Sequence, residues 1–375
     1  MKKLFLMLSL LFGPGMVVML ADTDSGSIIT AAQSGAMFGY KLLLAQIILI
    51  PILYCCQELT IRLGIVSGLG HGALIKKYFG SFWAWFSIAT LILTCIGAIL
   101  SQFSGLVGVG LLFGIKPIYS LTATVLFLTI VVMTGSYRRV EKISLLLGLF
   151  ELIFIYVAYK AHPNLIAVKK ELFVIPFHNK EYWYLMAGNI GAVIMPWMIF
   201  YQQSAVVDKK LSIKYLNFSR IDTFIGAIVT QVIMIAVLMV TAATLGKTRS
   251  NLPLDTVQQI SHALIPFLGV NTGKILFAVG MIGASLIASV VVSLTAAWSI
   301  GELTNFKHSL ENRPKEAPWF YFSYIIILII GAVFVYLNLN LIKIGVAVTV
   351  MNALLLPLVL GFLLLLANKA LVGKY

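Results

Sequence analysis

Two acidic residues, Asp22 and Asp24, interrupt an otherwise apolar stretch near the start of the chain. They belong to the run Asp-Thr-Asp-Ser-Gly-Ser at 22–27, after which small and apolar residues resume. An ionised carboxylate at membrane depth costs about 2.5–3.5 kcal/mol on insertion scales, so it usually has a function. Carboxylates, hydroxyls and the main-chain carbonyls of a broken helix are the oxygen ligands that hard cations prefer. The residue types therefore predict a divalent-cation site at 22–27.

This site needs a membrane helix that is interrupted near its middle. Residues 12–37 are predicted to form one such span, because the glycine and serines at 25–27 are poor continuers of a membrane helix. Unwound backbone inside a membrane is tolerated only where it is buried in protein or lines a wet cavity. The alternative is a short polar loop outside the membrane. It is disfavoured because residues 28–37 alone are too short to span.

Composition identifies the solvent around most of the chain. Hydrophobic residues make up 60% of the sequence and charged residues 11%, against about 25% charged in soluble proteins, and the mean hydropathy is +1.00. We therefore expect an all-α polytopic membrane protein with the lipid bilayer as its main partner. The net charge of +14 is attributed to loop lysines and arginines that set orientation, not to nucleic-acid binding. Nothing in the sequence identifies a protein partner.

Stretches of about 20 mostly apolar residues predict ten transmembrane helices in a single transmembrane domain. They are 12–37, 40–63, 82–112, 118–135, 143–161, 182–207, 222–246, 273–301, 319–338 and 341–367. Residues 252–268 are predicted to form an amphipathic surface helix. The basic residues are biased to one side, which predicts an integral plasma (inner) membrane protein with both termini in the cytoplasm. Those on the cytoplasmic side include Arg138, Arg139, Lys142, Lys209, Lys210, Lys214 and Arg220.

The sixth span repeats the interruption of the first. Pro196 lies in the middle of 182–207, and because proline has no amide hydrogen, the helix is expected to open around 192–196. An ordinary proline kink is the alternative. Breaks in the first and sixth of ten spans predict two five-helix halves, about 12–161 and 182–367, arranged as an inverted repeat. Broken helices in corresponding places of two halves indicate a transport site.

Several motifs together resemble the Nramp (natural resistance-associated macrophage protein) family of divalent-metal transporters, and the likeness covers most of the chain. The family pattern in the first helix is Asp-Pro-Gly-Asn. The matching segments are Gly13-Pro-Gly, Asp24-Ser-Gly-Ser27, Gln33-Ser-Gly-Ala-Met-Phe-Gly-Tyr40, Gln57-Glu-Leu-Thr-Ile-Arg-Leu-Gly-Ile-Val-Ser-Gly68, Gly191-Ala-Val-Ile-Met-Pro196, Asn352-Ala-Leu-Leu-Leu-Pro357 and Leu364-Leu-Leu-Ala-Asn368.

The resemblance implies a set of metal-site residues. Asp24 is the anionic ligand, and Ser27 stands where the family has asparagine. The main-chain carbonyls of Ala21 and Ala192, the thioether of Met195, and Thr349, which replaces a glutamine, complete the implied set. Asp22 has no family counterpart, and it either joins the site or its entrance or is a solvated or ion-paired residue. Surrounding polar groups are predicted at Thr23, Gln202 and Gln203, with an interhelical hydrogen bond as the alternative for Gln202.

Departures from the family pattern concern proton handling. Trp197 stands where the family has histidine, and Ala98 and Ser101 fall where proton-coupled members carry carboxylates. Proton relays in membranes need titrating groups. The hypothesis is therefore that metal movement is weakly coupled or uncoupled to protons, which resembles the magnesium-transporting branch related to the family.

The predicted function is alternating-access transport of Mg²⁺ and/or Mn²⁺, which are the substrates. No enzyme motif and no resident cofactor are expected. A sulfur ligand at Met195 favours transition metals, whereas oxygen-only surroundings favour Mg²⁺. Three alternatives stay open: a proton-coupled Mn²⁺/Fe²⁺ importer, a sodium-coupled carrier of a small solute, and a membrane metal sensor that does not transport.

Overall fold

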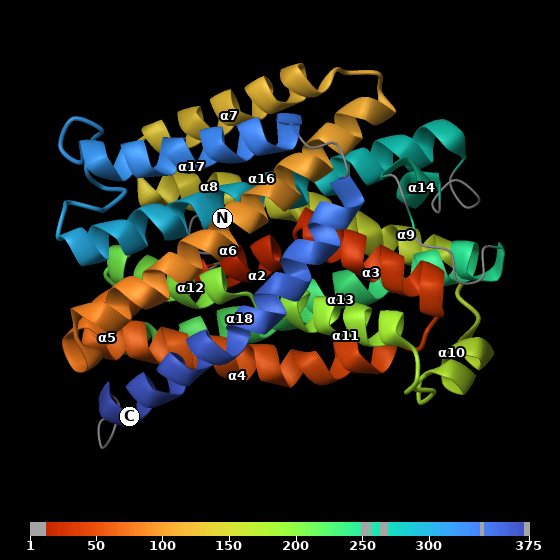
Figure 1. Ribbon diagram of the computed structural model, residues 1–375, viewed down its shortest axis with the longest axis horizontal. Coiled ribbons are helices and arrows are strands. Elements are labelled where there is room, and N and C mark those ends of the chain that lie inside the picture. The colour runs from red at the N-terminus through yellow and green to blue at the C-terminus, as the bar shows by residue number, and fades with distance from the viewer. Residues whose placement is uncertain (1–12, 249–253, 255–256, 263–268, 338–340, 371–375) are drawn as a thin grey trace, which may run out of the picture.

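The computed structural model describes residues 13–248, 254, 257–262, 269–337 and 341–370, and all regular structure in this part of the chain is helical (Figure 1). Seven helical stretches within it are long and apolar enough to cross a membrane. The outward faces of several long helices carry large exposed apolar side chains, such as Phe82, Ile130 and Leu354, which suits contact with lipid. The predicted all-α membrane class is confirmed, while the count of ten spans stays a prediction.

The helices follow the predicted spans with shifts of a few residues. The first predicted span forms α2 (Pro14–Asp22) and α3 (Ser25–Phe38), and the sixth forms α11 (Lys180–Val193) and α12 (Pro196–Asp208). The fifth is jointed, because the short 3-10 helix η1 separates its two α-helices. The other elements are α4 (Leu43–Ser67), α5 (His71–Phe79), α6 (Ser81–Leu112), α7 (Pro117–Met133), α8 (Tyr137–Gly148), η1 (Leu149–Leu152), α9 (Ile153–Ala161), α10 (Leu165–Glu171), η2 (Ile213–Tyr215), α13 (Leu216–Thr248), α14 (Val257–His262), α16 (Val270–Thr304), α17 (Pro318–Leu337) and α18 (Leu341–Ala370).

Three short helices lie between the spans. α5 and α10 occupy segments for which the sequence had predicted no helix. α14 falls inside the amphipathic helix predicted at 252–268, and much of the rest of that range lies outside the described residues. The division of the chain into repeats at about 161 and 182 stays a prediction.

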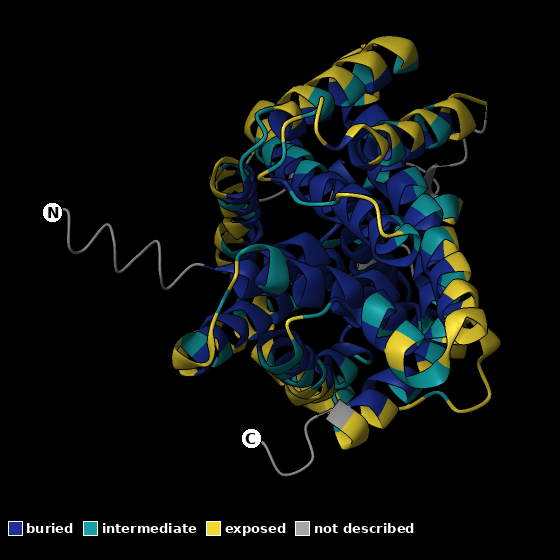
Figure 2. Ribbon diagram, turned by 90° about the vertical axis from the view of Figure 1, so that its left-hand side faces the viewer, coloured by how far each residue is buried: buried dark blue, intermediate teal, exposed yellow. Residues whose placement is uncertain are grey.

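The two broken helices lie in the interior of the bundle. α13 packs along α2, α3 and α4, α16 packs along α6, and α18 packs along α11 and α6. Figure 1 shows α2 and α3 in red near the middle, between α6 and α16 on one side and α13 on the other. Every residue from Gly13 to Phe38 is buried, as is every residue from 191 to 206. Figure 2 shows the same contrast between a buried centre and exposed outer helices. The alternative of a polar loop outside the membrane at 22–27 is therefore wrong.

The first break is narrower than predicted. Asp22 still belongs to α2 and residues 25–27 already belong to α3, so only Thr23 and Asp24 are non-helical. Asp24 caps α3, since its Oδ1 accepts the amide hydrogen of Ser27 at 2.7 Å, which is the usual role of aspartate before a helix. Ser25 and Ser27, which were predicted to unwind, instead start the next helix, because this cap gives an amide in the first turn of α3 its hydrogen-bond acceptor.

The second break agrees with the prediction from Pro196. The backbone is extended at Ile194 and Met195, and α12 restarts with Pro196 in its first turn, where a proline needs no amide partner.

Close backbone contact joins the second break to α18. A Cβ atom on Gly191 would lie 1.9 Å from the carbonyl oxygen of Thr349 and 2.6 Å from the amide of Ala353. The backbones of α11 and α18 approach each other through this glycine, as small residues allow in membrane helix pairs.

We therefore expect Gly191→Ala to destabilise the protein, because a methyl group against backbone atoms forces the helices apart. Overpacking costs about 1–3 kcal/mol, which should lower the midpoint of heat-induced aggregation in detergent. Gly361→Ala in α18, the helix that Gly191 of α11 packs against, is the matched control, since nothing lies within 4 Å of a Cβ at Gly361. Equal midpoints for the two variants would contradict this account of the contact.

Candidate metal site between the two helix breaks

The two breaks touch each other through one hydrogen bond. The Ser27 hydroxyl at the start of α3 donates to the main-chain oxygen of Ala192 at 2.9 Å. In a continuous helix this oxygen would accept the amide hydrogen of residue 196, but Pro196 has none. The proline thus frees the Ala192 carbonyl, and Ser27 meets it. The structure brings together two residues that lie 165 positions apart in the sequence and that the resemblance had placed in one site.

A second main-chain carbonyl loses its helical donor at the first break. The Ala21 oxygen would accept the amide hydrogen of Ser25 in a continuous helix. The Ser25 amide donates instead to the Gln102 side-chain oxygen of α6 at 3.0 Å. Each break therefore withdraws the regular donor from one alanine carbonyl, and both alanines are buried.

The Asp24 carboxylate follows the end of α2 at the first break and is 2% exposed. One oxygen accepts from the Ser27 amide, and the other accepts from Gln102 Nε2 at 2.6 Å. The position at a helix N-terminus also favours a negative charge. Carboxylate and carbonyl oxygens from two helix ends form a ligand set that suits a hard divalent cation.

Gln102 was missed by the sequence reasoning. It lies on α6, and its fully buried side chain bonds to the Asp24 carboxylate and to the amide and hydroxyl of Ser25 at the first break. The available signal was an amide in a span that the prediction treated mainly as an apolar helix with small residues. Neighbouring Ser101 also faces the break, because a Cβ on Gly26 would lie 2.6 Å from its hydroxyl oxygen.

Asp22 faces a different side of the break from Asp24. Its Oδ2 accepts from the Thr230 hydroxyl of α13 at 3.4 Å, and Thr230 also pairs with the Thr23 hydroxyl at 2.6 Å. Its Oδ1 has no hydrogen-bond partner, and neither does either carboxylate oxygen of the fully buried Glu151 in η1. Glu151 has the Thr23 hydroxyl and the two aspartates as polar neighbours.

Within the described residues, no three His, Cys, Asp or Glu side chains are close enough to hold a metal ion together. Uncharged oxygens would therefore have to supply most of the ligands of an ion at the break.

Met195 and Thr349 lie at the edges of this arrangement. Met195 is fully buried and precedes α12 as its N-cap residue. The Thr349 hydroxyl bonds with the Thr30 hydroxyl at 3.1 Å, one turn along α3 from Ser27, and donates to Val346 O at 2.8 Å. α18 also contacts the break directly, since a Cβ on Gly345 would lie 3.7 Å from the Gly26 backbone.

The two predicted glutamines bond to partners other than Asp24. Gln202 donates to the Thr223 hydroxyl of α13 at 2.9 Å, which is the interhelical hydrogen bond considered as its alternative. Gln203 contacts His71 Nδ1 at 2.9 Å and donates to the Leu69 carbonyl. Burial lowers the pKa of His71 to about 4, so this histidine is neutral at physiological pH.

The residues at the positions where the resemblance implies proton-handling groups are buried and do not titrate. Ala98, Ser101 and Trp197 are each fully buried, and Ser101 Oγ and Trp197 Nε1 have no hydrogen-bond partner. This side of the break holds hydroxyl and indole groups that can bond to water without taking up a proton.

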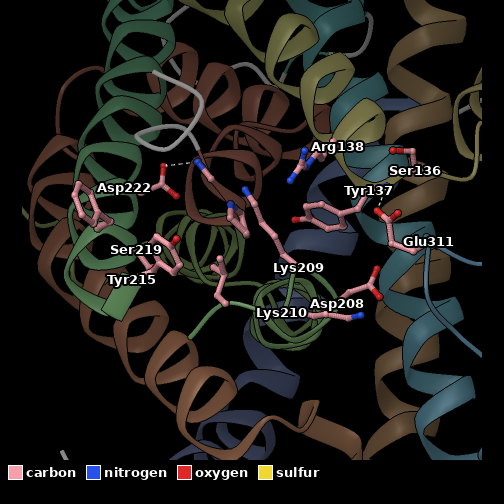
Figure 3. A pocket seen from close by; sticks show the side chains of 14 residues that line it. Ser136, Tyr137, Arg138, Asp208, Lys209, Lys210, Tyr215, Ser219, Asp222 and Glu311 are labelled. Atoms are coloured by element: carbon pink, nitrogen blue, oxygen red, sulfur yellow. Dashed lines mark hydrogen bonds between the residues drawn. The ribbon is translucent and has the colours of Figure 1, made fainter. Parts of the chain in front are cut away.

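A cavity of about 660 Å³ opens at the N-terminal end of α2 (Figure 3). Asp222 of α13 points into it and binds that helix end, accepting from the Gly13 amide at 3.0 Å and the Met16 amide at 3.1 Å. The cavity wall also carries Lys209, which pairs with Glu141 at 2.6 Å. Asp222 therefore holds the N-terminal end of α2 beside the cavity, while the break follows the C-terminal end of the same helix.

We expect Asp222→Ala to loosen this end of α2, because two buried amides lose their acceptor. Cap losses of about 0.5–2 kcal/mol correspond to a roughly two- to thirtyfold larger opened population. The measurement is the rate at which a water-soluble thiol reagent labels a cysteine at buried Met16, in a background without Cys55, Cys56 and Cys95. Asp222→Asn keeps one acceptor and should give an intermediate rate. Identical rates for all three proteins would show that Asp222 does not hold the helix.

Comparisons with known proteins point to one family. Residues 15–375 match the sequence profile of a family described as natural resistance-associated macrophage protein-like, Nramp. A divalent metal cation transporter, MntH, of Staphylococcus aureus (strain MRSA252) is 30% identical over 296 residues, which cover 72% of this chain and 64% of that protein. The corresponding protein of Staphylococcus haemolyticus (strain JCSC1435) is 28% identical, with 72% and 65% covered. The matched part of the chain thus spans slightly less than two thirds of these relatives.

Solved structures show the same fold. A manganese transporter of Eremococcus coleocola superposes with a TM-score of 0.75 at 20% identity, covering 100% of this chain and 83% of that one. A Na⁺-coupled sialic acid symporter superposes with a TM-score of 0.64 at 14% identity, covering 96% and 78%. At these identities the likeness extends to the arrangement of helices alone.

Proposed function

The chain belongs to the Nramp family, and from that membership we propose that it moves divalent metal cations across the membrane by alternating access between two five-helix halves. The family consists of transporters, so the chain is an integral membrane protein and not an enzyme. The single observation that carries the proposal is the meeting of the two helix breaks. Asp24 and two alanine carbonyls without their helical donors lie there, buried in the protein.

Mn²⁺ and Mg²⁺ are the substrates that we propose. Manganese is supported by the relatives, one of whose solved structures is named a manganese transporter. Magnesium is supported by the oxygen groups of this chain at the breaks, which are the Asp24 carboxylate, the Ser27 hydroxyl and the alanine carbonyls, because hard ions prefer oxygen ligands. Met195, at the second break, supplies the sulfur that would retain softer ions. The resulting carrier accepts several divalent ions.

Hydrogen bonds between helices close the protein on both sides of the first break, which supports an alternating-access cycle. At one end Asp222 fastens α2. At the other end the Leu254 amide donates to Gln33 Oε1 of α3 at 2.9 Å, and α14 packs on α3, α6 and α16. We assign the Asp222 end to the cytoplasm, with both chain termini on that side of the plasma membrane, because the basic residues concentrate there.

Proton coupling is proposed to be weak or absent. Support comes from Ala98, Ser101 and Trp197, which occupy the expected relay positions without a titrating group. A neutral His71 is bonded to Gln203 and lies away from Asp24, so it offers no replacement relay beside the ion.

We expect Asp24→Ala to reduce Mn²⁺ and Mg²⁺ uptake into proteoliposomes at least about tenfold, the equivalent of about 1.4 kcal/mol, because the ion loses its anionic ligand. Wild-type flux should saturate with metal concentration and should not need sodium. Glu181→Ala removes an exposed carboxylate from α11 and should leave uptake unchanged. Binding of metal by wild type without any flux would instead identify a sensor, and equal flux in Asp24→Ala would refute the site.

Coupling is tested in the same vesicles with a pH-sensitive dye inside. Metal uptake by wild type should acidify the lumen by far less than one proton per ion, because the α6 and α12 positions carry no titrating group. A protonophore-sensitive acidification that follows metal entry one for one would overturn the weak-coupling proposal while leaving metal transport intact.

A further inference from the structure

Gln102 makes contacts that a packing residue does not need. From α6 its Nε2 donates to Asp24 Oδ2 at 2.6 Å, while its Oε1 accepts from the amide and the hydroxyl of Ser25 at 3.0 and 2.9 Å. The side chain is fully buried. Its amide therefore lies directly between the carboxylate expected to bind the ion and the backbone of the first break.

The end of the amide that faces Asp24 is the one that a cation would displace. Its NH₂ hydrogens carry partial positive charge and occupy one oxygen of the carboxylate, much as an ion would. A dication bound to Asp24 would repel these hydrogens and attract an amide oxygen, which is a ligand of the kind that Mg²⁺ and similar hard ions accept. A half-turn of the terminal amide exchanges the two ends without moving α6.

The neighbours of Gln102 can accommodate that half-turn. The Ser101 carbonyl lies 2.7 Å from the Ser25 hydroxyl as a second acceptor for its one hydrogen. When that hydrogen points to Ser101, the lone pairs of the hydroxyl oxygen are free to accept from a turned NH₂ group. The Ser25 amide loses Gln102 Oε1 as its acceptor. The carbonyl of Ala21, four residues earlier in the sequence, is the acceptor that a regular helix would give it. A carbonyl oxygen has two lone pairs and can serve an ion and an amide together.

We propose that Gln102 is a ligand of the transported ion, and that its side-chain oxygen takes the place of the amide that the family pattern has where this chain has Ser27. The proposal rests on the proposed transport function. Without metal, the NH₂ end partly neutralises the buried Asp24 carboxylate. With metal, the oxygen end completes the coordination from α6, a helix that supplies no ligand in the set implied by the resemblance.

The test compares binding of Mn²⁺ and Mg²⁺ chlorides to the purified full chain in detergent by titration calorimetry. Gln102→Leu should weaken affinity for both ions at least about tenfold, since losses around metal sites reach about 10–100-fold. Gln102→Glu, which keeps the oxygen and adds charge, should bind at least as tightly as wild type. Ser27→Asn combined with Gln102→Leu should recover most of the affinity, because an amide oxygen returns from the family's usual position.

A role in merely holding Asp24 predicts the opposite pattern. Gln102→Glu would then repel Asp24 and bind weakest of all, and Ser27→Asn would not restore Gln102→Leu; either result overturns the proposal. Gln46→Leu is the matched control, because Gln46 is a fully buried glutamine whose amide bonds to Asn189. It should lower thermal stability without changing affinity. Unchanged metal uptake by Asp24→Ala would refute the transport proposal itself. If Asp24→Ala loses uptake but the Gln102 variants do not show the expected affinities, only this inference is refuted.

Discussion

A carboxylate buried in the interior of the helix bundle is the constraint around which the rest of this structure is arranged. Asp24 is almost inaccessible to solvent, and a charge in such a place is costly unless hydrogen bonds or a cation compensate it. The chain compensates it in two ways. The end of a helix directs its Ser27 amide at one oxygen, and Gln102 of α6 directs an amide at the other. The Ser27 amide can keep its bond while an ion binds the remaining lone pairs of the carboxylate, whereas the Gln102 amide is the group that we propose turns its oxygen to the ion.

The two helix breaks have different physical causes but produce the same kind of group. In the second break Pro196 lacks the amide that the Ala192 carbonyl would use, so the cause is covalent. In the first break the Ser25 amide exists but donates to Gln102, so the cause is a tertiary contact. Each break leaves one alanine carbonyl, that of Ala21 or Ala192, without its regular helical donor. The hydrogen bond from Ser27 to the Ala192 carbonyl joins the two breaks. A change in the distance between the breaks would therefore alter the proposed ligand set directly, which suits the alternating access that we propose.

Polar groups around the first break are divided between two sides. Asp24 faces Gln102, whereas Asp22 faces Thr230 of α13 and has Glu151 nearby. Oxygens on the second side lack donors, although the chain places no third carboxylate close enough for a shared metal site within its described residues. The division explains why two aspartates separated by one residue have different partners: one ends α2 and the other begins α3.

The sequence by itself determined the membrane class, both interruptions and much of the candidate site. Hydropathy and the proline at 196 act locally, and Asp24, Ser27 and Ala192 follow a local motif, so these features could be predicted before any contact was known. The narrow first break, the partners of Asp22 and the role of Gln102 could not. The narrow break depends on the cap that Asp24 makes with the Ser27 amide. The other two depend on which face of a distant helix meets the break: α6 brings Gln102 across 78 residues and α13 brings Thr230 across 208. Only tertiary packing decides such meetings, because a buried polar group bonds to whatever partner the fold places beside it.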